Sequence, residues 1–160
     1  MYAPAMDIYR VERVATIPAP ADVVYAHIVD LRKWASWSPW EGLDPDLKRT
    51  YSGADSGVGA AYAWSGNREA GEGTMEITEA VEPSHVAIAL DFVKPFRSSS
   101  ATTFDLVPEG DGTRVTWTMT GPKTLLTRMM GLFKSMDAMI GPDFEKGLTR
   151  LTAVATRTWG

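Results

Sequence analysis

The sequence contains no cysteine and only two histidines, His27 and His85. Without thiols there is no disulfide, no cysteine nucleophile and no cysteine-ligated zinc site, and two histidines are too few for a histidine-rich metal centre. Clustered positive charge is also missing, because the formal net charge is −4 and the 16 Lys and Arg residues are scattered. Nucleic-acid binding requires clustered cations against the phosphates, so we expect no nucleic-acid partner, and we expect no metal or other cofactor.

Long apolar runs are absent as well, since none approaches the ~18 residues of a membrane-spanning helix. Residues 1–14 carry four charged side chains, whereas a signal peptide holds an uninterrupted apolar stretch. These features predict a cytoplasmic protein without stable membrane insertion. The 160 residues suffice for one hydrophobic core, and no repeat or low-complexity segment divides them. We therefore expect a single domain over 1–160.

Alternation of polar and apolar residues predicts an N-terminal strand followed by antiparallel hairpins. Residues 8–17 alternate in this way, and Pro18 and Pro20 end the strand before a short helix over 22–29. Glycine, proline, aspartate and asparagine mark the turns between further strands. These strands are predicted at 47–52, 59–64, 73–81, 85–93, 99–107 and 113–120. Because one face of the resulting sheet is apolar, another element must cover that face.

Helical spacing returns after Gly121-Pro122. Apolar residues recur every three or four positions from Leu125 to Ala155, which predicts a long C-terminal helical region over the sheet. Pro142 removes a backbone donor and clashes with the preceding turn, so we expect a sharp kink or two helices meeting at Gly141-Pro142. The predicted fold class is α+β, with about seven antiparallel strands curved around the C-terminal helix and a short helix after the first strand.

Several segments resemble the START/Bet v 1-like (SRPBCC) superfamily. Residues 17–25 are similar to the entry into its first helix, and Trp34 and Trp37 follow. Segments 64–67, 71–75, 112–117 and 141–148 are similar to bacterial members described as polyketide cyclase/dehydrase-like. The resemblance covers nearly the whole chain and implies the helix-grip fold with a cavity between sheet and helix. It implies no single reaction, because the superfamily includes lipid and hormone carriers, polyketide cyclases, coenzyme-Q-binding proteins and relatives of an Hsp90 activator.

No P-loop, G-x-S-x-G elbow or H-E-x-x-H helix is present, and we assign no catalytic residue. Aromatic and methionine side chains are typical of the walls of apolar ligand pockets. The ligand-binding candidates are Tyr62, Trp64, Met75, Phe92, Phe104, Trp117, Met129, Phe133 and Met136. The same residue types also fill ordinary cores, so both interpretations stay open for each candidate. His27 flanks the apolar side of the short helix without an identifiable partner, which favours a structural role.

These observations favour a non-enzymatic binder or carrier of a small hydrophobic or amphipathic molecule. Two alternatives stay open. A polyketide cyclase/dehydratase-type enzyme would use the same cavity and would place a polar cluster inside it. A partner-binding module of the Hsp90-activator-like branch would have a filled interior and an exposed apolar patch. A homodimer is also left open.

Overall fold

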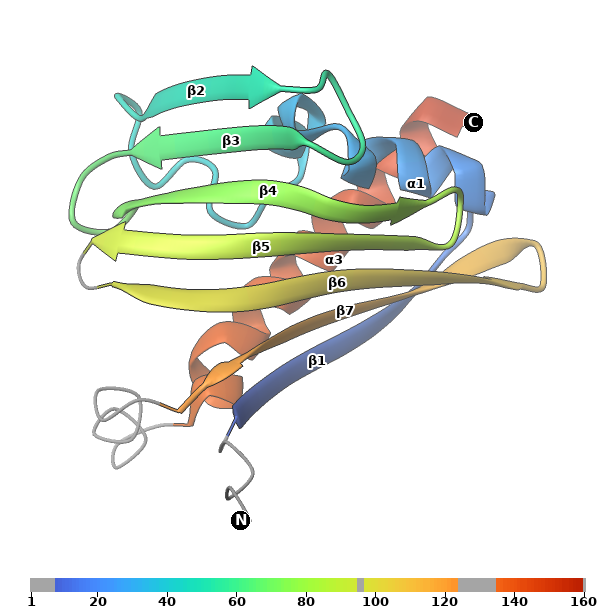
Figure 1. Cartoon of the computed structure of the whole chain (residues 1–160). Helices are drawn as coiled ribbons and strands as arrows, with labels where there is room; N and C mark the ends of the chain where they lie inside the picture. The colour runs from blue at the N-terminus through green and yellow to red at the C-terminus, as the bar shows by residue number, and fades with distance from the viewer. Residues whose placement is uncertain (1–7, 95–96, 124–134, 160) are drawn as a thin grey trace, which may run out of the picture.

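The computed structural model describes residues 8–94, 97–123 and 135–159. These residues form one antiparallel sheet in the strand order β1-β7-β6-β5-β4-β3-β2 (Figure 1). The strands are β1 (Ile8–Ile17), β2 (Lys48–Gly53), β3 (Ala60–Ser65), β4 (Glu72–Val81), β5 (His85–Lys94), β6 (Ser98–Glu109) and β7 (Gly112–Pro122). Each begins and ends within two residues of the predicted strand. The predicted α+β helix-grip fold is confirmed.

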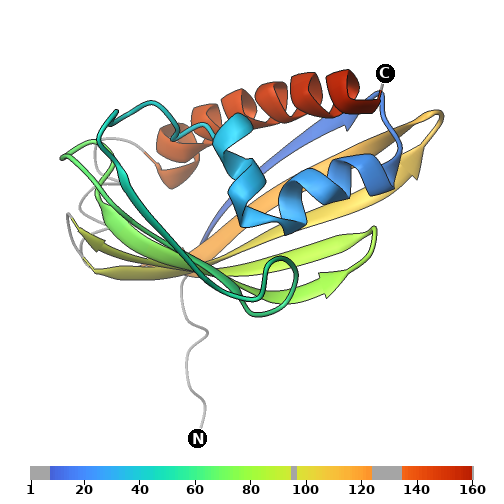
Figure 2. The same cartoon turned by 90° about the horizontal axis from the view of Figure 1, so that it is seen from above.

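Among the described residues, three helical segments cover the concave face of the sheet. Helix α1 (Ala21–Val29) follows the two prolines that end β1, with Pro20 at its N-cap. The 3-10 helix η1 (Leu31–Ser36) comes directly after it, and Asp30 caps its start by accepting a hydrogen bond from the Arg32 backbone N–H. Helix α3 (Met136–Trp159) lies along the same side of the curved sheet (Figure 2). Every helical segment in the part of the chain that the structure describes therefore lies on one face.

Helix α3 does not end at Gly141-Pro142. It runs as one helix from Met136 to Trp159 with Pro142 inside, so the expected junction of two helices is not found. Pro142 lies in the second turn, close to the helix start, where its missing donor removes one intrahelical bond and leaves the longer C-terminal part intact. The adjacent Gly141 leaves room for the side chain of Arg13, whose Nη2 would lie 2.0 Å from a Cβ at this position. Arg13 binds Asp137 at 2.8 Å and thereby joins β1 to α3.

Aromatic rings form the centre of the core, where α3 and η1 meet β6 and β7. Trp117 stacks on Phe144 of α3, with ring centroids 4.0 Å apart and planes 6° apart. Trp37 is fully buried, and its indole N–H donates to the His27 carbonyl at 2.9 Å. Trp34 donates in the same way to Ile28 at 2.8 Å. The tryptophan-rich segment after α1 therefore lies between helix and sheet, and the indole N–H groups of Trp34 and Trp37 have hydrogen-bond partners.

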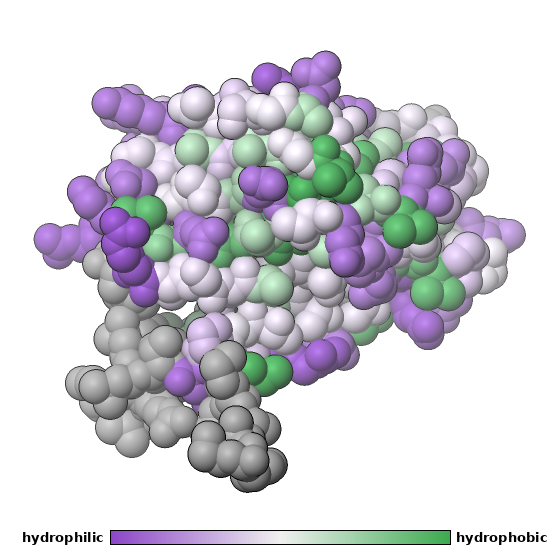
Figure 3. Space-filling model, in the orientation of Figure 1, coloured by the Kyte–Doolittle hydropathy of each residue, from purple (hydrophilic) through white to green (hydrophobic). Residues whose placement is uncertain are grey.

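The opposite, convex face of the sheet is exposed to solvent. Figure 3 shows this face as mostly polar or neutral, with scattered apolar patches. His85 lies here at the start of β5, and its ring contacts Asp105 at 2.7 Å and Glu79 at 3.0 Å. The hydrogen bond to Asp105 is the main cause that raises the pKa of His85. None of the helices in the described ranges combines the length and hydropathy needed to cross a bilayer.

Candidate functional site

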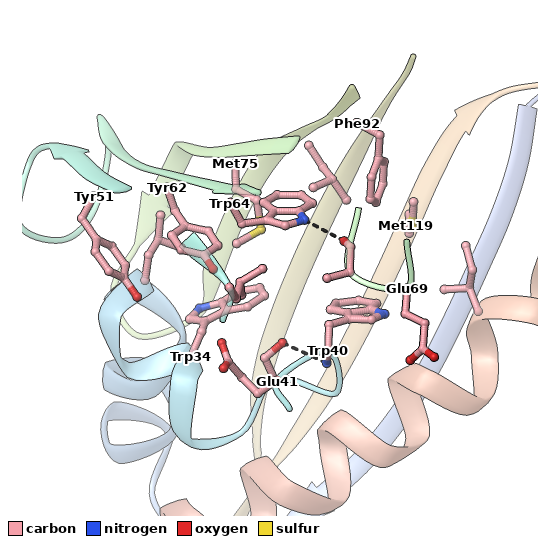
Figure 4. A pocket seen from close by; sticks show the side chains of 16 residues that line it. Trp34, Trp40, Glu41, Tyr51, Tyr62, Trp64, Glu69, Met75, Phe92 and Met119 are labelled. Atoms are coloured by element: carbon pink, nitrogen blue, oxygen red, sulfur yellow. Dashed lines mark hydrogen bonds between the residues drawn. The ribbon is translucent and has the colours of Figure 1, made fainter. Parts of the chain in front are cut away.

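A cavity of about 220 Å³ opens between the curved sheet, η1 and the beginning of α3 (Figure 4). Its wall is mainly aromatic and aliphatic. The aromatic lining residues are Trp34, Trp40, Tyr51, Tyr62, Trp64 and Phe92. Leu31, Leu47, Ala70, Met75, Leu90, Met119 and Ile140 complete the apolar wall. A pocket with this lining favours an apolar ligand, because burying apolar surface is the main source of binding free energy.

Strand register assembles the aromatic wall from the part of the sheet nearest β2. Tyr51 lies opposite Tyr62, with ring centroids 5.1 Å apart. Tyr62 and Trp64 share one face of β3 because they are two residues apart, and their rings stack with centroids 5.9 Å apart. Phe92 of β5 meets the Trp64 ring edge-on at 5.7 Å. Three strands thus present a continuous row of rings to the cavity.

Gly73 on β4 makes the position of Trp64 possible. It lies opposite Trp64 in the β3–β4 register and opposite Phe92 in the β4–β5 register. A Cβ on Gly73 would lie 2.6 Å from the Trp64 ring, so a larger residue would displace the indole. The indole N–H donates to the Ala70 carbonyl at 2.9 Å, as the dashed line in Figure 4 shows. Trp64 therefore presents its ring, and not an unsatisfied polar group, to the cavity.

Polar side chains interrupt the apolar wall at Ser38, Glu41 and Glu69. Glu41 is held in an ion pair with Arg49 of β2. Burial, together with the negative charge of Glu41, raises the pKa of Tyr62 to about 12. The Tyr62 phenol therefore keeps its proton at neutral pH and can donate a hydrogen bond. Glu69 is exposed, in the turn that precedes β4.

A sequence profile for the family described as "Polyketide cyclase / dehydrase and lipid transport" matches residues 9–156. The chain belongs to this family. The match runs from β1 into the last turns of α3, so every described element that borders the cavity is part of the family domain. The predicted membership of the SRPBCC superfamily is confirmed.

Solved structures share the fold with this member of the polyketide cyclase / dehydrase and lipid transport family at low identity. Ara h 8.0201 is 11% identical with a TM-score of 0.65, over 94% of this chain and 99% of that chain. MLL2253 from Mesorhizobium loti is 21% identical with a TM-score of 0.64, over 94% and 98%. Aha1 from Colwellia psychrerythraea, described as a dimer, is 14% identical with a TM-score of 0.58, over 85% and 90%. No curated protein matches significantly.

The structure separates the predicted ligand-binding residues into groups. Tyr62, Trp64, Met75 and Phe92 line the cavity together. Phe104 and Trp117 lie instead in the packed core, where they are 0% and 1% exposed. Met136 is partly buried against that core at the start of α3 and is not in the cavity wall. Met129 and Phe133 lie outside the described residues.

Sequence reasoning missed part of the wall. Tyr51 lies on the short strand β2 and was not a candidate, although its place opposite Tyr62 follows once the β2–β3 hairpin is in register. Trp40 was also not among the candidates, yet it lines the cavity and is 37% exposed. Glu41 follows it in a loop without a motif, so no local signal places its carboxylate beside Tyr62.

His27 lies away from this cavity, between α1 and α3. Its Nε2 is 3.0 Å from the Thr158 hydroxyl, and its Nδ1 is buried without a partner among the described residues. Burial is the main cause that lowers the pKa of His27 below its usual 6.5, and Lys33 adds to the effect. Its contacts join two helices, which agrees with a structural role.

Protonation of His27 should destabilise the fold as the pH falls. The pKa of His27 is lowered in the folded state, so on acidification the unfolded chain binds the proton first. The free energy of unfolding is therefore unaffected by His27 above about pH 6.5 and decreases as the pH falls below that value. His85 has a raised pKa and acts in the opposite direction. We expect the free energy of unfolding to fall more on acidification in the natural protein than in His27→Gln. Urea unfolding at about pH 7.5 and about pH 5.5 measures this, and equal losses would contradict the assignment.

Proposed function

We propose that this protein binds a small hydrophobic or amphipathic molecule in the cavity and carries it unchanged. The observation that carries this proposal is the row of rings formed by Tyr51, Tyr62, Trp64 and Phe92, which borders open space on the cavity side. Aromatic faces pack well against flat apolar molecules. An engineered apolar cavity of about 150 Å³ accommodates benzene, so the larger volume here suits a ligand of about two fused rings.

The polar groups in the wall suit an amphipathic ligand. The Tyr62 phenol, the Ser38 hydroxyl and the Glu69 carboxylate offer a few hydrogen-bonding groups around the apolar wall. A small number of polar contacts orients a ligand, while the apolar surface supplies most of the affinity. A molecule with an apolar ring system and one polar substituent therefore matches the lining best.

The same polar groups support carriage over catalysis. A general base works best with a pKa near the operating pH, whereas the pKa of Tyr62 is about 12. The Glu41 carboxylate is already engaged in an ion pair with Arg49. The Hsp90-activator-like alternative predicts a filled interior, and the open cavity between sheet and helix argues for a ligand in that space.

Purification without denaturant followed by native mass spectrometry tests this proposal. We expect a bound small molecule, or, if the protein emerges empty, saturable one-to-one binding of N-phenyl-1-naphthylamine that fluorescence detects. The ligand recovered after incubation should have its original mass. A changed mass would favour the cyclase/dehydratase-type enzyme. An empty protein without saturable probe binding would contradict a ligand in the cavity.

A further inference from the structure

Strand β1 forms one edge of the sheet, and β2 forms the other (Figure 1). Within the described ranges, no strand pairs with the outer side of β1. Strand β1 has ten residues and no proline, whereas β2 has six residues. Short edges resist pairing with another strand, and long edges without proline favour it. The edge of β1 is therefore the one that can accept a further strand.

The convex-face side chains of residues 8–14 in β1 follow a symmetrical order, and Thr16 continues this face beyond them. Ile8 and Val14 are the outer members of the 8–14 segment, and each is 53% exposed. Arg10 and Glu12 lie between them and form an ion pair with each other at 2.5 Å. The order along the strand is apolar, cation, anion, apolar. When a second copy of the strand runs in the opposite direction, each cation lies opposite an anion and each apolar residue lies opposite an apolar residue. An antiparallel copy of the same strand therefore matches it in both charge and hydropathy.

We propose that β1 pairs antiparallel with β1 of a second copy of this chain, centred on Val11, so that one sheet runs through both copies. In this register Arg10 faces Glu12 of the second copy, and Ile8 faces Val14. Each pairing occurs twice because of the twofold symmetry. Main-chain hydrogen bonds between the edges supply affinity, and the paired side chains supply the register.

Neighbouring registers are unfavourable. Centring the pair on Arg10 or on Glu12 places identical charges opposite each other, which is destabilising. A shift by a single residue would turn the apolar concave face of one copy toward the convex face of the other. Fully buried Val11 of one copy would then lie opposite exposed Glu12 of the other, a mismatch of an apolar and a charged side chain.

The surroundings of the edge agree with a strand at this position. A groove of about 240 Å³ opens beside it, between β1 and α3, and Val14, Ala15 and Leu148 form part of its lining. A second β1 would cover the exposed part of Val14 next to this groove. The ligand cavity lies toward the β2 edge, so pairing through β1 leaves it accessible. The dimer therefore does not depend on the proposed function.

Charge reversal tests the register. We expect sedimentation to show a concentration-dependent dimer for the natural protein, and a dimer dissociation constant about tenfold higher or more for Arg10→Glu, because four carboxylates then meet. The double variant Arg10→Glu/Glu12→Arg exchanges the two charges within each copy and should restore the natural dissociation constant. Circular dichroism checks that both variants fold. A monomeric natural protein, or a double variant as weak as the single one, would overturn the proposal.

Cysteine cross-linking provides an independent readout, because the chain has no cysteine of its own. In Ile8→Cys/Val14→Cys the two thiols face each other across the interface, within reach of a disulfide. We expect this variant to form covalent dimers under mild oxidation. Val14→Cys alone is the matched control, because its thiol faces Ile8 of the second copy and should stay uncrosslinked. Equal cross-linking of the two variants would overturn the register.

Discussion

Replacing Trp117 by alanine should reduce the free energy of unfolding by about 3 kcal/mol or more. Trp117 is 1% exposed and stacks on Phe144 with centroids 4.0 Å apart, so the substitution leaves a hole in the packed core. Its indole N–H is buried without a hydrogen-bond partner among the described residues. Removal of that unsatisfied donor recovers part of the loss, which places the expected value near the low end of the ~3–5 kcal/mol range for large aromatic residues.

Trp40→Ala is the control for this prediction, since Trp40 is 37% exposed and borders the cavity. This substitution should reduce the free energy of unfolding by less, about 1 kcal/mol, because it removes less buried apolar surface from a packed environment. Denaturant unfolding measures both values. A loss below ~1 kcal/mol for Trp117→Ala would mean that its ring borders open space, and would return this residue to the list of ligand contacts.

The strands were predictable because their signal is local. Alternation along 8–17 and along the six later segments needs only the period-two geometry of a strand, and the prolines and glycines mark the ends. The covering helix was predictable from its three-to-four spacing. The continuity of helix α3 through Pro142 was not predictable, because the cost of one missing hydrogen bond depends on where the helix begins.

The division between core and cavity was not predictable from the sequence. Trp64 and Trp117 both lie on the concave face by alternation, and nothing in their neighbours along the chain separates them. Phe144 stacks on Trp117, whereas Trp64 lies over Gly73 and meets Phe92 at its edge. Which ring is covered depends on the angle at which α3 crosses the sheet. The contacts that join α3 to the sheet, such as Arg13 with Asp137, connect residues far apart in sequence, so no local pattern reveals them.

Filling the cavity should abolish ligand binding while leaving the fold intact. Met75 on β4 points into the cavity in Figure 4, and tryptophan at this position would occupy the space that a ligand needs. Overpacking of a fully packed core costs stability, but a side chain that enters an open cavity meets less resistance. Thr74→Trp is the matched control, because it makes the same substitution on the same strand and places the ring on the exposed convex face.

The affinity of N-phenyl-1-naphthylamine for the natural protein, Met75→Trp and Thr74→Trp is the most direct test of a ligand cavity between sheet and helix. Fluorescence titration should give saturable binding to the natural protein and to Thr74→Trp with similar dissociation constants. The dissociation constant of Met75→Trp should be about tenfold higher or more, because the probe no longer fits. Equal affinity in all three proteins would place the probe elsewhere and would contradict the cavity as the binding site.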